Sequence, residues 1–147
     1  GRLGPIAVAR DPGSLPEMPY IPGVMPEFTQ HVALRWATGS LPYAGGADAR
    51  YEGYCRFREP AGDVEGLIGL LDAWPCPSLS LLKSPTPAST ISWTAHLLHV
   101  PESFDGWFAF ASETVAGEGG FHTSVGRLHA PDGRLAAWSE QLVAIFG

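Results

Sequence analysis

A single carboxylate ends an apolar stretch in the middle of the sequence. Residues 66–77 read GLIGLLDAWPCP, and Asp72 is the one charged residue among them. A helix C-terminus and apolar neighbours both disfavour negative charge, so a carboxylate placed there has a raised pKa. Such a group can accept a proton from water as a general base. The alternative is that Asp72 caps the loop before Pro75, and the stretch itself leaves both interpretations open.

Two other polar positions could contribute to a site. Gln141 shares the alternating face of its expected strand with Val143 and Ile145, which places an amide on a partly apolar face. Buried amides usually have a structural partner, so this position is suggestive and no more. Thr90 begins another expected strand, and alone it indicates no chemistry.

The histidines and cysteines do not form a recognisable metal site. His96 and His99 are three residues apart on an expected strand, so their side chains face opposite sides. The five histidines show no HxxxH spacing and no Cys/His cluster. We therefore expect neither a metal nor another cofactor.

The elements that position these residues follow from hydrophobic periodicity. Alternation predicts strands at 31–37, 49–59, 89–100, 106–115, 121–129 and 135–146. Within 89–100 the pattern places Ile91, Trp93, Ala95 and Leu97 on one face. An Asp-Gly turn after 121–129 supports a hairpin.

One helix interrupts this series of strands. Asp63 is the expected N-cap, and Pro75 and Pro77 stop the helix. Apolar residues occur on nearly every side of it, namely Val64, Leu67, Ile68, Leu70, Leu71 and Trp74. A helix of this kind is stable when it is surrounded by protein. Two strands, one buried helix and a four-strand antiparallel meander predict an α+β hot dog fold, in which the sheet wraps around one long central helix.

Composition sets broad limits on the function. The chain has 147 residues, 45% of them hydrophobic and 16% charged, and its net charge is −6. One globular domain without a nucleic-acid surface is therefore expected. No apolar run reaches the length of a membrane span. Cys55 and Cys76 are too few for a disulfide framework, so a reduced cytoplasmic setting is expected, although a single disulfide stays possible.

Residues 1–26 differ from the rest of the chain in composition. Prolines at positions 5, 12, 16, 19, 22 and 26 oppose regular structure. We expect 1–26 to be a linker, or the tail of a preceding hot dog, and 27–147 to be a hot dog domain. The sequence starts at Gly1 without a methionine, which suggests a fragment or a processed product.

Three segments in order resemble the C-terminal half of the acyl-CoA thioesterases of the type II, double hot dog family. They are LIGLLDAWPCP, ASTISWTAHLL and PDGRLAAWSEQLVAIF. The proline-rich stretch followed by HVALRW is similar to the inter-domain linker and first strand of that half. The resemblance covers roughly residues 13–147. No single segment is diagnostic, but their order and spacing are moderately specific.

The resemblance implies a hydrolytic site and a partner. The family's aspartate, threonine and glutamine fall on Asp72, Thr90 and Gln141, which would activate water to hydrolyse a fatty acyl-CoA thioester. Coenzyme A would be part of the substrate, and aromatic residues such as Trp74, Trp93, Phe108 and Phe110 would line an acyl tunnel. A second hot dog, either the other half or another copy, would pair edge to edge with this one.

Two departures from the family leave other functions open. Ser92 and Trp93 stand where many relatives carry a polar pair after the threonine, and the family's first hot dog is missing. A non-catalytic scaffold or acyl-binding module is one alternative, because a fold does not fix a function. A hot dog dehydratase or hydratase is another, and His96 would then be expected to face Asp72.

Overall fold

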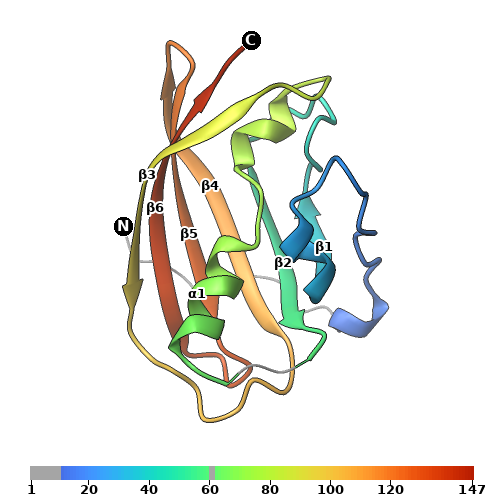
Figure 1. Cartoon of the computed structure of the whole chain (residues 1–147), viewed down its shortest axis with the longest axis vertical. Coiled ribbons are helices and arrows are strands. Elements are labelled where there is room, and N and C mark those ends of the chain that lie inside the picture. Colours follow the sequence, from blue (N-terminus) through green and yellow to red (C-terminus); the bar gives the residue numbers. More distant parts are fainter. Residues whose placement is uncertain (1–10, 60–61) are drawn as a thin grey trace.

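One antiparallel sheet of six strands forms the frame of the molecule. The computed structural model describes residues 11–59 and 62–147. The sheet order is β1-β2-β4-β5-β6-β3. The strands are β1 Val32–Gly39, β2 Arg50–Phe57, β3 Ala88–Leu97, β4 Phe108–Glu118, β5 Phe121–His129 and β6 Leu135–Ile145. Figure 1 shows the sheet curving behind the single α-helix.

The strand β3 departs from the expected four-strand meander. β4, β5 and β6 do follow one another as neighbours, but β3 pairs with β6 at the edge and β4 pairs with β2. The chain therefore crosses from β2 to the far edge through the helix and returns to the middle of the sheet. Alternation within a strand carries no information on which strand lies beside it, so the sequence could not show this crossover.

The helix α1 runs over Val64–Asp72 and begins as expected. The Asp63 carboxylate accepts a hydrogen bond from the Gly66 amide at 2.9 Å and so caps the first turn. Three shorter 3-10 turns accompany it, at Pro12–Ser14 (η1), Glu27–His31 (η2) and Pro77–Leu81 (η3). No basic residue lies in the last turn of α1 to offset the charge of Asp72.

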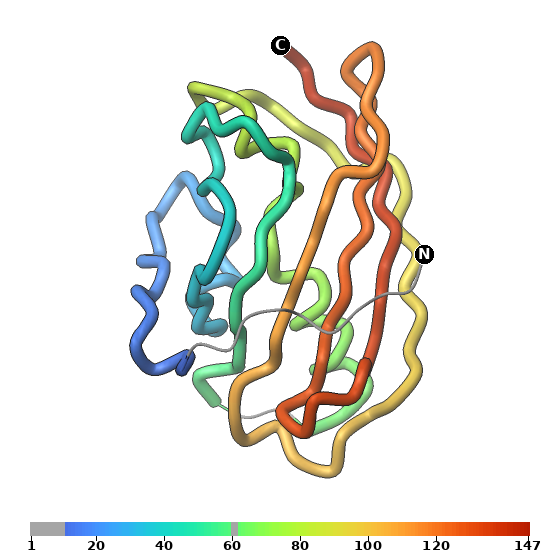
Figure 2. The backbone as a smooth tube through the Cα atoms, turned by 180° about the vertical axis from the view of Figure 1, so that it is seen from behind, coloured from blue at the N-terminus to red at the C-terminus, as the bar shows by residue number. Residues whose placement is uncertain are grey.

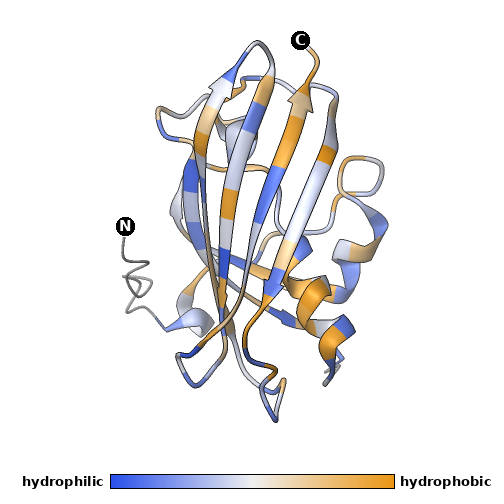
Figure 3. Ribbon diagram, turned by 90° about the vertical axis from the view of Figure 1, so that its left-hand side faces the viewer, coloured by the Kyte–Doolittle hydropathy of each residue, from blue (hydrophilic) through white to orange (hydrophobic). Residues whose placement is uncertain are grey.

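The core lies between α1 and the concave face of the sheet. Leu67 and Leu70 from the helix, and Phe108 and Leu128 from the sheet, are fully buried. Figure 3 shows the contrast: α1 is mostly hydrophobic, whereas both kinds of residue alternate along the strands beside it. The hot dog fold is confirmed. Enclosure is nevertheless incomplete, because Val64, the first residue of α1, is 44% exposed.

The two edges of the sheet differ. Residues before β1 lie along its outer edge, where Met18 donates to the Leu34 carbonyl at 2.8 Å. Glu17 forms a bridge with Arg35 there, and the Arg35 guanidinium donates to the Leu15 carbonyl at 2.7 Å. Figure 2 shows this segment beside β1 from behind. The β3 edge has no such cover among the described residues, so one edge of the sheet is closed and the other is open.

Two sequence expectations concern the setting of the chain. Cys55 and Cys76 are both free thiols in the structure, so the single disulfide left open by the sequence is not formed. In the described part of the chain, no helix is long and apolar enough to cross a membrane. Residues 1–10 of the expected linker lie outside the described residues.

The packing of α1 predicts where the fold is most sensitive. Leu67→Ala should lower the free energy of unfolding by about 3 kcal/mol, because it removes fully buried methyl groups and leaves a cavity. Val64→Ala, at the exposed first residue of the same helix, should cost only about 0.5 kcal/mol. Urea denaturation of both variants measures the difference. Equal losses would contradict the assignment of the buried face.

Candidate active site

Thr90 and Gln141 meet across neighbouring strands. The Gln141 side-chain nitrogen donates to the Thr90 hydroxyl at 2.8 Å. Thr90 lies near the start of β3 and Gln141 in the second half of β6, and the antiparallel pairing of these strands brings the two positions together. The two residues that the family resemblance selected, 51 positions apart in sequence, are thus in direct contact.

A β-bulge makes this contact possible. Thr90 pairs with Val143 and Ser92 pairs with Leu142, so Ile91 is an extra residue on β3. The bulge reverses the alternation, and Thr90 comes onto the same face as Trp93, which pairs with Gln141.

The bulge also corrects one expectation from the sequence. Ile91 does not share a face with Trp93 and Ala95, and its side chain is 55% exposed. Leu97 lies on the face of Trp93 and Ala95 but is 38% exposed at the end of the strand. Trp93 and Ala95 do pack against the core.

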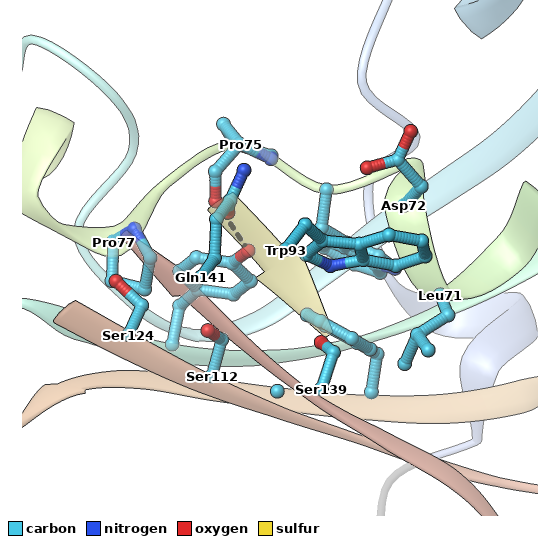
Figure 4. A pocket seen from close by; sticks show the side chains of 13 residues that line it. Leu71, Asp72, Pro75, Pro77, Trp93, Ser112, Ser124, Ser139 and Gln141 are labelled. Atoms are coloured by element: carbon cyan, nitrogen blue, oxygen red, sulfur yellow. Dashed lines mark hydrogen bonds between the residues drawn. The ribbon is translucent and has the colours of Figure 1, made fainter. Parts of the chain in front are cut away.

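Asp72 reaches the same place from the end of α1. Asp72, Trp93 and Gln141 all line one small pocket between the helix end and the sheet. The pocket volume of about 20 Å³ is roughly what one water requires. Figure 4 shows Gln141 and Asp72 on the two sides of Trp93. Thr90 does not line the pocket and contributes through Gln141.

Partial burial sets the electrostatics of Asp72. Desolvation raises the pKa of its carboxyl group above the ordinary value, although the side chain keeps access to solvent. Among the described residues, no ion pair to Asp72 opposes this shift. The direction agrees with the expectation from its apolar neighbours, and it suits a group that must accept a proton near neutral pH.

A row of hydroxyl groups on the concave face was not anticipated. Ser112, Ser124 and Ser139 line the pocket on β4, β5 and β6, and each is nearly fully buried. Ser112 donates to the Val125 carbonyl at 3.0 Å, and the Ser124 hydroxyl lies 3.4 Å from that of Thr114. Each of these three strands has a serine at an inward position. The sequence alone does not show that these serines form a row, because that depends on the strand order.

From this row a chain of hydrogen bonds continues to the β4–β5 hairpin. The Ser78 hydroxyl lies 2.7 Å from that of Thr114 and 2.9 Å from His122 Nδ1. Ser78 is 1% exposed, so these bonds satisfy a hydroxyl that would otherwise be buried without a partner.

Two other sequence expectations fail at this site. Phe108 is fully buried against Phe104 and does not line the pocket, while Trp74, Trp93 and Phe110 line a space too small for an acyl chain. These aromatic residues therefore form core and pocket wall, and the expected tunnel is absent from this pocket. His96 does not line the pocket and stacks on Trp138 at 4.1 Å, so it does not face Asp72 as a dehydratase base would.

The raised pKa of Asp72 predicts how stability depends on pH. The folded protein binds the proton of Asp72 more tightly than the unfolded chain, so this group favours folding at low pH. That contribution is complete below about pH 3.9, the unfolded value, and is lost as pH rises through the folded pKa. Asp72→Asn should therefore raise the melting temperature at neutral pH relative to wild type, and the difference should vanish at low pH. A constant difference at all pH values would contradict the shift.

Comparison with known proteins places this arrangement in a family. The family model described as acyl-CoA thioesterase C-terminal domain matches residues 12–145. No curated protein sequence matches the chain.

Solved structures support the fold. A hot dog protein of unknown function from Alicyclobacillus acidocaldarius aligns with TM-score 0.81 and 22% identity over 97% of this chain and 55% of its own. A candidate thioesterase II from Thermobifida fusca gives 0.78 and 23% over 98% and 55%, and an acyl-CoA thioesterase II from Mycobacterium marinum gives 0.71 and 14% over 99% and 57%. The chain thus spans about half the length of these structures. Since the family model matches nearly the whole chain, the chain belongs to the acyl-CoA thioesterase C-terminal domain family.

Proposed function

We propose that the chain carries the hydrolytic site of an acyl-CoA thioesterase. The observation that supports this most directly is the contact between Gln141 and Thr90 beside a water-sized pocket that Asp72 also lines. A carboxylate and an amide thus line one pocket, and a hydroxyl from a third element contacts the amide. The family membership gives this arrangement its chemical meaning.

Asp72 acts in this proposal as general base. It takes a proton from a water held in the pocket, and the resulting hydroxide attacks the thioester carbonyl carbon. A C–O bond forms, the C–S bond then breaks, and the thiolate of coenzyme A receives the proton from Asp72. The products are the free acid and the thiol, and no side chain becomes covalently attached.

Gln141 and Thr90 orient the water. Because the Gln141 nitrogen donates to the Thr90 hydroxyl, the amide plane is fixed and its oxygen stays available to accept a hydrogen bond. In this proposal a water in the pocket donates one hydrogen to this oxygen and the other to Asp72, which leaves a lone pair for the attack on the thioester carbonyl carbon. Thr90 is accordingly a positioning residue, and it acts through Gln141.

The same proposal includes a second hot dog domain. Among residues 11–59 and 62–147, nothing covers the β3 edge, whereas residues 15–18 lie along the β1 edge. Ile91, Leu97 and Leu98 on or next to β3 are all exposed. A strand from another hot dog would extend the sheet there and cover these side chains.

The hydrolytic role is tested by Asp72→Asn with a panel of acyl-CoAs, in which the release of free thiol is followed. The amide keeps the shape of the side chain but cannot accept the proton, so kcat should fall by about a hundredfold or more with little change in KM. Wild-type kcat/KM should fall as pH drops through the raised pKa of Asp72, since the protonated base is inactive. In Asp72→Asn this pH dependence should be absent.

Asp105→Asn provides the matched control, because Asp105 is exposed and outside the pocket. It should hydrolyse the panel at the wild-type rate. Turnover that survives Asp72→Asn would mean that another group activates water. No turnover by the correctly paired wild type would favour the scaffold or acyl-binding alternative.

The pairing at β3 is tested by light scattering of the 147-residue chain. The wild type should form dimers at micromolar concentration, and Ile91→Lys should shift it to monomers, because a charge on an open edge opposes strand pairing. Val24→Lys, at an even more exposed position before β1, should leave the dimer intact. A monomeric wild type, or dimers unaffected by Ile91→Lys, would contradict pairing at this edge.

A further inference from the structure

Asp72 lines two hollows of different size and polarity. The water-sized pocket with Gln141 lies toward β3 and β6. The second is an open groove of about 560 Å³ between α1 and the segment that leads into β1. Its volume falls in the range of small-molecule sites, roughly 300–1,000 Å³. Asp72 is the one residue that lines both.

The groove has an apolar interior. Val32 and Phe57 contribute from β1 and β2, and the side chain of Phe28 is 45% exposed beside them. The helix contributes Gly66 and Gly69, which add no side chains to the space. A Cβ at Gly69 would lie 3.2 Å from the Phe57 ring, so any larger residue there would narrow the groove.

The pocket on the other side of Asp72 cannot accept an acyl chain. It has room for about one water, and buried serine side chains contribute to its walls. A thioester whose carbonyl carbon lies at Asp72 must therefore direct its acyl chain elsewhere. The groove is the larger space that begins at the same carboxylate.

The charge of the lining residues indicates whether the groove suits the acyl chain or the coenzyme A part of the thioester. Asp63 and Glu65 lie among its lining residues near the far end of α1, and no Lys or Arg lines it. His31 is the only basic type present. The phosphate groups of coenzyme A would be repelled by these carboxylates, whereas an uncharged hydrocarbon chain would not.

We infer that this groove binds the acyl chain of the substrate, which runs along α1 from Asp72 toward Phe28. The nucleotide part of coenzyme A then extends from Asp72 away from this groove. This inference rests on the proposed thioesterase function and adds the place of the hydrocarbon chain. The nine residues of α1 give the groove a length of about 13 Å, so chains beyond a certain length gain no further contact.

The test is a hydrolysis series with butanoyl-, octanoyl-, dodecanoyl- and hexadecanoyl-CoA in the assembled protein. Wild-type kcat/KM should rise with chain length, by up to about fourfold for each methylene that is fully buried, and then level off. Gly69→Leu fills the groove and should reduce kcat/KM for dodecanoyl-CoA by about tenfold or more. The loss on butanoyl-CoA, whose short chain reaches less of the groove, should be much smaller than the loss on dodecanoyl-CoA.

Two milder variants keep the test valid if Gly69→Leu folds poorly. Gly69→Ala favours the helix and should give a smaller loss with the same dependence on chain length. Phe28→Ala removes part of the groove wall and should also weaken the response to chain length. Phe121→Ala is the matched control, since Phe121 is 53% exposed and does not line the groove.

Failure of this inference can be told from failure of the proposed function. Turnover that depends on Asp72 but shows the same chain-length profile in wild type, Gly69→Leu and Phe28→Ala would overturn the groove and leave the thioesterase standing. If the wild type hydrolyses no acyl-CoA, binding of the fluorescent fatty acid cis-parinaric acid decides instead. Binding lost in Gly69→Leu and kept in Phe121→Ala would support the groove as an acyl site, and equal binding in all three would overturn it.

Discussion

The packing of α1 against the concave face of the sheet is the interaction on which the rest depends. Leu67 and Leu70 are fully buried against a face that includes Phe108 and Leu128. Because interiors pack tightly, the helix has no freedom to slide or rotate on the sheet. Its last residue, Asp72, is thereby held at the pocket that Trp93 on β3 and Gln141 on β6 also line. The position of the candidate base is thus a consequence of core packing one turn away.

The β-bulge at Ile91 positions the other two candidate residues, Thr90 and Gln141. Without it, strict alternation would place Thr90 and Trp93 on opposite faces of β3, and the hydroxyl would not reach Gln141. The bulge also sends Ile91 outward at the open edge of the sheet. One inserted residue therefore both completes the polar pair and adds an apolar side chain to the edge that we expect a second domain to cover.

The sequence predicted what depends on local pattern and missed what depends on pairing. The cap at Asp63, the apolar helix and the six strands follow from periodicity and capping chemistry, which act within a few residues. The position of β3 beside β6, the bulge and the serine row arise from contacts between distant segments, and alternation does not encode them. The family resemblance implied that the aromatic residues line an acyl tunnel, whereas core packing accounts for Phe108. Asp72 could be singled out because a charge in an apolar run is rare, but only the fold shows that Trp93 and Gln141 line the same pocket.

The candidate base Asp72 must meet two opposing requirements, desolvation and access to water and substrate. A general base gains proton affinity when it is desolvated, yet it must meet water and substrate. Here the carboxylate lies at the boundary between a water-sized pocket and an open groove. It is therefore partly desolvated, while water and substrate can still reach it. A substrate chain in the groove would remove water from one side of the carboxylate and raise its pKa further. Binding of the acyl chain would in this way strengthen the base at the moment when a thioester is present to be attacked.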